Sequence, residues 1–138
     1  MKIMGMDIGD KRIGIALTDP EKKLSIPHTI LRNDKEFSGK LSKMLDEENI
    51  EKIIVGMPYT LKGEIGPQGN KVLEFVEKNI LNMGIEIVYQ DERFTSKLEE
   101  EPGIKKRKKS GHKDKFSAAL ILQGYLDRIS SIKRIENE

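Results

Sequence analysis

Three apolar runs follow one another near the start of the chain, and their order is the strongest constraint on its fold. The runs at 2–7, 12–18 and 24–31 each have the length and alternation of a β-strand. The short connection between the first two favours a tight hairpin, and Pro27 places the third run at a sheet edge or a strand end. The three runs therefore predict an antiparallel meander.

The pattern then changes to an alternation of helices and strands. Helical and strand-like spacing predicts helices over 37–45, 72–80 and 114–129, a short helix near Thr95, and strands over 52–56 and 85–89. Short continuous apolar runs are typical of buried parallel strands. The whole order predicts an α/β domain over residues 1–138, in which a mixed five-stranded sheet combines the meander with two parallel strands and carries packed helices. It matches the ribonuclease H-like fold.

Acidic residues stand at three places where such a sheet would gather them. Asp7 ends the first strand, Asp91 and Glu92 follow the last strand, and Asp114 opens the final helix. Sites in open α/β sheets lie beyond the carboxyl ends of the strands, so we expect these side chains to converge. Such a cluster needs a cation, because bare carboxylates repel one another or take up protons. With no cysteine and only two histidines, the sequence favours Mg²⁺ or Mn²⁺ over softer metals.

Each acid also has a structural interpretation that the sequence leaves open. Asp7 could be a turn residue paired with a neighbouring cation, and Asp91 and Glu92 could simply be solvated. Asp114 could act through the dipole of the final helix. Only the combination of these acids favours catalysis, in which paired cations about 3.5–4 Å apart promote hydrolysis of a phosphodiester.

A dense basic segment at 105–115 distinguishes that part of the chain from the rest. It holds seven Lys or Arg residues and one Asp, a net charge of +6, whereas the whole chain has +2 and the remainder therefore −4. Such a segment attracts nucleic acid, although a solvated lysine-rich loop remains an alternative. The predicted nucleic-acid contacts are Lys11, Arg12, Arg93, Lys105, Lys106, Arg107, Lys108, Lys109 and Lys113.

Glycines surround the first acid and recur after the strand at 52–56. Gly5 and Gly9 flank Asp7 and are expected to leave space for a metal and a phosphate backbone. A loop with several glycines follows the later strand and can either contact substrate or serve as a plain connector. Its predicted substrate contacts are Gly56, Pro58 and Thr60.

The chain resembles the bacterial YqgF-like family, described as Holliday-junction-resolvase-like proteins and as nucleases of pre-16S ribosomal RNA. The resemblance runs nearly from end to end. It rests on GMDIGDKRIGIALTD (5–19), IIVGMPYTLKGEIGPQGNKVLEF (53–75), YQDERFTS (89–96), KKRKK (105–109) and DKFSAALILQGYLD (114–127).

The resemblance implies a ribonuclease H-like fold and a nuclease dependent on Mg²⁺ or Mn²⁺ that matures the 5′ end of 16S rRNA. It implies that Asp7, Glu92 and Asp114 are the catalytic, metal-binding acids, with Asp91 a weaker candidate ligand. Precursor rRNA and assembling ribosomal particles are the implied partners. Thr60 stands where the family usually has Asn, which bears on substrate contact.

Three other functions stay open. A four-way DNA junction resolvase would use the same acids as a homodimer, whereas a non-catalytic RNA-binding assembly factor would need only the basic segment. An actin-like ATPase shares the DxGxxxxG pattern but needs two lobes, more than 138 residues supply. The lack of a long apolar stretch, a leader and cysteine predicts a cytoplasmic protein with no membrane partner. Both a monomer and a homodimer are compatible with the sequence.

Overall fold

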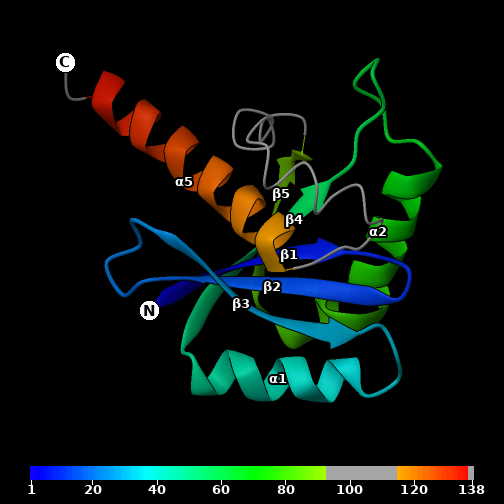
Figure 1. Cartoon of the computed structure of the whole chain (residues 1–138). Coiled ribbons are helices and arrows are strands. Elements are labelled where there is room, and N and C mark those ends of the chain that lie inside the picture. The colour runs from blue at the N-terminus through cyan, green and yellow to red at the C-terminus, as the bar shows by residue number, and fades with distance from the viewer. Residues whose placement is uncertain (93–114, 137–138) are drawn as a thin grey trace.

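The computed structural model describes residues 1–92 and 115–136, which contain one five-stranded sheet in the order β3-β2-β1-β4-β5 (Figure 1). The strands are β1 (Lys2–Ile8), β2 (Arg12–Thr18), β3 (Ser25–Arg32), β4 (Ile50–Met57) and β5 (Glu86–Asp91). The first three pair antiparallel, and β4 is parallel to both β1 and β5. The predicted combination of a meander with two parallel strands is confirmed.

Helices cover both faces of this sheet. The helical elements are α1 (Phe37–Glu47), α2 (Pro67–Asn79), the 3₁₀ helix η1 (Leu81–Met83) and α5 (Lys115–Glu136). Figure 1 shows α5 on one face, while α1 and α2 pack on the other. The short helix predicted near Thr95 lies outside the described residues. No helix of the described part of the chain has an apolar stretch that could cross a bilayer.

Strand β1 is central, and its side chains alternate between two buried clusters. Met4 and Met6 join the core shared with α1 and α2, whereas Ile3 joins the smaller core beneath α5. Because successive side chains of a strand point to opposite faces, Asp7 lies on the face that α5 covers. The predicted central position of the strand that carries Asp7 is confirmed.

Pro27 occupies an edge strand, as its missing N–H predicts. Strand β3 lies at one end of the sheet. Its register with β2 shifts between the pairs Ile15–Thr29 and Ala16–Pro27, so the proline stands at an irregularity of the ladder. An edge position and a shifted register both spare a ladder hydrogen bond that proline cannot donate.

Gly5 allows α5 to approach β1 closely. A Cβ atom added to Gly5 would lie 2.6 Å from Cβ of Leu122 and 2.8 Å from the carbonyl oxygen of Ala118. Such distances are too short for real contacts, so only glycine fits beneath the helix. The expectation that Gly5 leaves space for a metal is therefore wrong, because the helix itself fills that space.

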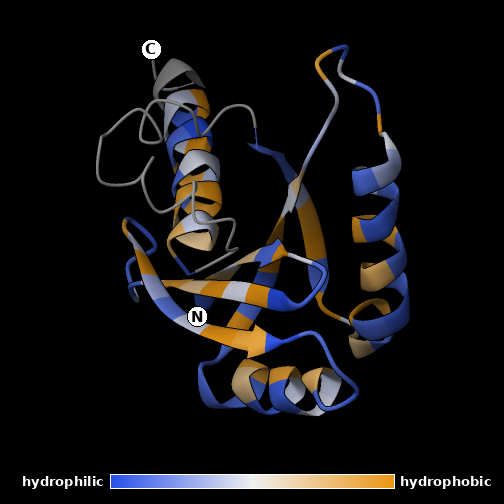
Figure 2. Ribbon diagram, turned by 45° about the vertical axis from the view of Figure 1, so that its right-hand side comes forward, coloured by the Kyte–Doolittle hydropathy of each residue, from blue (hydrophilic) through white to orange (hydrophobic). Residues whose placement is uncertain are grey.

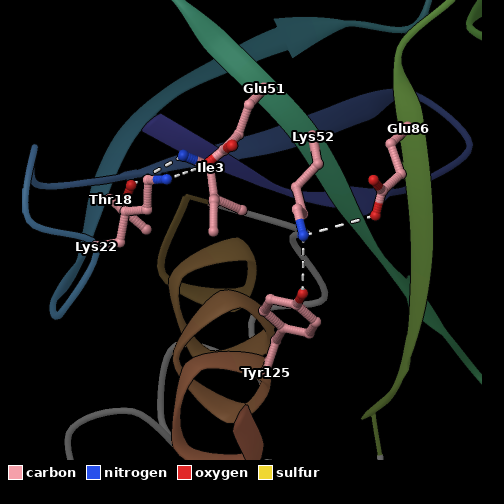
Figure 3. Close-up of polar contacts among 7 residues, drawn as sticks. All are labelled: Ile3, Thr18, Lys22, Glu51, Lys52, Glu86 and Tyr125. Atoms are coloured by element: carbon pink, nitrogen blue, oxygen red, sulfur yellow. Dashed lines mark hydrogen bonds and ion pairs between the residues drawn. The ribbon is translucent and has the colours of Figure 1, made fainter. Parts of the chain in front are cut away.

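Lys52 forms a second anchor for α5, near the amino ends of the parallel strands (Figure 3). Its Nζ donates a hydrogen bond to the hydroxyl of Tyr125 at 3.3 Å and lies 3.5 Å from Oε2 of Glu86. Burial alone would lower the pKa of Lys52, but these two partners outweigh it and raise that pKa. This contact ties α5 to β4 and β5, and thereby helps to fix the helix over the sheet.

Candidate active site

Asp7 is a buried carboxylate with glycines on both neighbouring strands. It is 1% exposed. On one side it pairs with Gly14 of β2. On the other side, the preceding residue Met6 pairs with Val55 of β4, so Gly56 lies beside Asp7. Because these glycines have no side chains, groups from other elements can approach the sheet beside Asp7. Burying a carboxylate is costly unless hydrogen bonds or charges compensate for it, so its position needs a structural or functional reason.

Glu92 reaches back over the strand next to Asp7. Its Oε1 lies 2.8 Å, and its Cγ 3.1 Å, from the point that a Cβ atom of Gly56 would occupy. Ile121 of α5 contacts the same point. Since adjacent strands are about 4.8 Å apart, the carboxylate of Glu92 lies above the strand that neighbours Asp7. The structure thus brings Asp7 and Glu92 to one face and one end of the sheet.

Asp91 lies on the opposite face. It pairs with Met57 of β4, whose side chain belongs to the core of α1 and α2. Glu92 follows the end of β5, and its carboxylate lies over Gly56 beside Ile121 of α5, so Asp91 and Glu92 lie on opposite faces of the sheet. Of these two sequence candidates, the structure brings only Glu92 to the face that carries Asp7.

Gln90 lies on the same face as Asp7 and Glu92, and sequence reasoning did not single it out. It pairs with Gly56 and is 1% exposed. Its Oε1 has no hydrogen-bond partner in the described part of the protein. Counting back by two from Glu92 would have placed Gln90 on the same face, but a lone glutamine in a strand carries no other signal in the sequence.

The third predicted acid, Asp114, lies outside the described residues, as do Arg93, Lys105, Lys106, Arg107, Lys108, Lys109 and Lys113. Helix α5 begins at Lys115, the residue that follows Asp114, and three residues later Ala118 contacts Gly5 of β1. Over the ranges 1–92 and 115–136, no three His, Asp or Glu side chains gather closely enough to hold a metal ion. The described part of the site therefore contributes two carboxylates, Asp7 and Glu92.

The β1–β2 hairpin carries two of the predicted nucleic-acid contacts at its tip. Lys11 and Arg12 are both exposed. The tip is held in place by Asn33, whose backbone N–H donates to the carbonyl of Lys11 at 2.9 Å and whose Nδ2 donates to that of Gly9 at 3.0 Å. Two cations are thus presented on a braced turn next to the end of β1.

A braced loop follows β4 at the same end of the sheet. Pro58 and Thr60 are half-buried in it. Thr60 closes the turn, since its N–H donates to the carbonyl of Glu64 at 2.9 Å and its Oγ1 accepts from the N–H of Glu64 at 3.1 Å. Figure 2 shows the loop extending beyond the sheet, and Leu61 in it is 98% exposed. The sequence singled out Thr60 but not the leucine after it.

The donor set of this site suits a hard divalent cation. Asp7 and Glu92 offer carboxylate oxygens, Gln90 offers an amide oxygen, and the chain has no cysteine. Mg²⁺ and Mn²⁺ prefer oxygen ligands of this kind. The position beyond the carboxyl ends of parallel strands is also where open α/β sheets place their sites.

Comparison with known proteins identifies the family. The family model RuvX, described as Holliday junction resolvase, matches residues 1–128. A protein of Sulfurihydrogenibium sp. (strain YO3AOP1), named "Putative pre-16S rRNA nuclease", is 44% identical over 133 residues, which cover 94% of this chain and 92% of that protein. A protein of the same name from Desulforudis audaxviator is 37% identical, covering 92% of this chain and 94% of that one.

Solved structures agree on the fold. The RuvC protein of T. thermophilus in complex with Holliday junction substrate superposes with a TM-score of 0.62 at 15% identity, covering 94% of this chain and 96% of that one. A second Thermus thermophilus RuvC structure gives 0.60 at 14% identity. The ribonuclease H-like fold predicted from the order of elements is confirmed. The match of the family model to residues 1–128 and the identity with these relatives show that the chain belongs to the RuvX, or YqgF-like, family of Holliday-junction-resolvase-type nucleases.

Proposed function

We propose that this protein is a divalent-metal-dependent nuclease that hydrolyses phosphodiester bonds in the 5′ region of precursor 16S rRNA. The observation that carries the proposal is the placement of Asp7 and Glu92 on one face, at the carboxyl end of the parallel strands. The names of the relatives support the substrate. Assembling ribosomal particles in the cytoplasm would then be its working partner.

The proposed roles combine the placement of Asp7 and Glu92 with the sequence pattern of the other residues. Asp7, Glu92 and Asp114 hold one or two Mg²⁺ or Mn²⁺ ions, which when bound lower the pKa of water and stabilise the leaving oxygen. Lys11 and Arg12 bind phosphates from the tip of the hairpin, and so do Arg93 and the basic residues at 105–109 and 113. Pro58 and Thr60 hold the loop after β4 in position for the RNA.

A cleavage assay on a precursor 16S rRNA fragment tests this proposal. Wild-type protein with Mg²⁺ or Mn²⁺ is expected to cut the fragment, and EDTA to stop the reaction. Asp7→Asn and Glu92→Gln should each lower the rate more than about 100-fold, because losing a ligand costs at least as much as losing its outer-shell support. Asp91→Asn, on the other face, should have a much smaller effect. Equal cleavage by wild type and Asp7→Asn would discard the mechanism.

A four-way DNA junction is the second candidate substrate. The description of the family and the similarity to RuvC favour it. A resolvase cuts two strands symmetrically and needs a dimer, so the assay is repeated on branched DNA and the mass in solution is measured. Faster cleavage of the junction by a dimer would assign this protein to DNA. RNA binding that survives Asp7→Asn without any cleavage by wild type would instead indicate a non-catalytic assembly factor.

A further inference from the structure

Gln90 holds a buried oxygen that has no hydrogen-bond partner within residues 1–92 and 115–136. Among the side chains that the structure describes, its Oε1 is the only fully buried nitrogen or oxygen without a hydrogen bond. An unpaired buried acceptor costs stability, and nearly all buried polar groups have a partner. A bound ion or an ordered water is an ordinary explanation for such an orphan. The unpaired oxygen therefore indicates that Gln90 contacts a bound ion or an ordered water.

The position of Gln90 links it to the proposed catalytic acids. It pairs across β5 and β4 with Gly56, which also neighbours Asp7, so the three residues form one row across the sheet. Glu92 follows two residues later, and its carboxylate lies over Gly56, the residue that pairs with Gln90, so both lie on the same face. Gly56, which lies between Gln90 and Asp7, has no side chain of its own, and the carboxylate of Glu92 lies in the space above it, next to Ile121 of α5. Gln90 thus lies on the same face of the sheet as the two carboxylates, on the strand next to the one that Glu92 covers.

Packing alone does not require a glutamine here. The preceding residue on this face of β5 is Val88, which pairs with Ile54 of β4. Both side chains pack in the apolar core beneath α5. A methionine of similar volume could fill the position of Gln90 without burying a polar atom. The amide is therefore best explained by what its oxygen binds.

We propose that Gln90 helps to hold the divalent cation, as a neutral oxygen donor beside Asp7 and Glu92. This proposal rests on the proposed function, since it assumes that those acids bind the cation. A neutral donor adds an oxygen to the site without adding a third negative charge to two nearby carboxylates. Hard cations accept amide oxygens of Asn and Gln alongside carboxylates and waters.

The substitution Gln90→Met tests the proposal, because it keeps the volume and removes the acceptor. The variant is expected to be more stable without metal and to bind metal more weakly. In EDTA the melting temperature should rise by about 2 °C or more, since the orphan oxygen is gone. In a calorimetric titration with Mn²⁺ alone, the Kd should increase about tenfold or more. A residue with only a structural role would not produce this pair of changes.

Gln123→Met is the matched control. Oε1 of Gln123 accepts a hydrogen bond from the backbone N–H of Ser25 at 3.1 Å, and its Nε2 donates to Asp127 at 3.0 Å. Both ends of this amide are satisfied, so its loss should lower the melting temperature. The Mn²⁺ affinity should stay at the wild-type value, because Gln123 contacts β3 rather than the row of Asp7.

The titration of Asp7→Asn separates the failure of this inference from failure of the proposed function. If Asp7→Asn weakens Mn²⁺ binding and Gln90→Met leaves it unchanged, Gln90 is not part of the metal site and the inference is overturned alone. If Asp7→Asn also leaves Mn²⁺ binding unchanged, the metal site itself is refuted. Weaker binding by both variants, with Gln123→Met unaffected, supports the inference.

Discussion

The carboxylate of Glu92 lies directly over Gly56, with Oε1 2.8 Å from the place of an added Cβ atom. Gly56→Ala should therefore push away Glu92, and with it Ile121 of α5. We expect a loss of about 1–3 kcal/mol in the free energy of unfolding from overpacking. Cleavage should fall by about 100-fold at a temperature where the variant is folded, because a shift of about 1 Å in a catalytic group has that effect. Urea denaturation and the rRNA cleavage assay measure the two losses.

Gly39→Ala is the control for Gly56→Ala. Gly39 lies in α1, and an added Cβ atom there would meet nothing within 4 Å. Alanine should stabilise the helix by about 0.5–1 kcal/mol and leave cleavage unchanged. If Gly56→Ala behaved in the same way, Glu92 would not depend on the bare surface of β4.

A second glycine substitution tests how α5 is seated. Gly5→Ala would bring a methyl group against the carbonyl oxygen of Ala118, which belongs to the helix backbone and cannot rotate away. The variant should lose at least about 1–3 kcal/mol in the free energy of unfolding. Chemical denaturation followed by circular dichroism measures this loss. A stability equal to that of wild type would contradict the close packing of α5 on β1.

The two glycines show what the sequence could and could not predict. Apolar runs predicted the five strands to within two residues at each end, because β1, β2 and β4 are buried and their patterns are strong. Helical spacing was less exact, since α2 begins five residues before, and α5 ends seven residues after, the predicted bounds. Gly5 was predicted to leave space for a metal, because its actual neighbour, Leu122 of α5, is far away in the sequence. No local pattern reports such a contact.

The acids show a similar division. Asp7 at the end of a central strand was predicted, since an acid that ends an apolar run is conspicuous. The choice between Asp91 and Glu92 depends on which face of β5 each occupies, and the sequence of an edge strand does not fix that face. The register with β4 decides it, because Asp91 pairs with Met57 of the other core. Gln90 was missed for the same reason.

The loop after β4 is expected to contact the nucleic acid through Leu61. An apolar side chain that is 98% exposed on a braced turn can pack against an unstacked base. Leu61→Ser should weaken binding of the precursor rRNA several-fold without changing the melting temperature. Filter binding compares Asp7→Asn alone with the double variant Asp7→Asn and Leu61→Ser, so that affinity is measured without cleavage.

Leu81→Ser is the matched control for Leu61→Ser. Leu81 is 58% exposed and lies in η1, which precedes the amino end of β5, at the end of the sheet away from the acids. Its substitution should leave RNA affinity unchanged. Equal losses of affinity for the two serine variants would show that any exposed leucine has this effect, and would remove Leu61 from the interface.

Lys52 should make stability depend on pH at the alkaline end. Burial alone would lower its pKa, but the hydroxyl of Tyr125 and the carboxylate of Glu86 outweigh burial and raise that pKa above its ordinary value of 10.5. A group with a raised folded pKa stabilises the protein below its unfolded pKa, and this stabilisation is lost as pH rises through the folded value. Lys52→Met should therefore cost about 1–2 kcal/mol in the free energy of unfolding at pH 8. The difference from wild type should shrink as the pH rises above 10.5.

Lys43→Met is the control, because it removes only an exposed ion pair with Glu47 on α1. It should cost less than about 0.5 kcal/mol in the free energy of unfolding, both at pH 8 and at alkaline pH. Urea denaturation of the three proteins at pH 8 and at alkaline pH makes the comparison. A gap between wild type and Lys52→Met that stays constant with pH would show that α5 is held by packing alone.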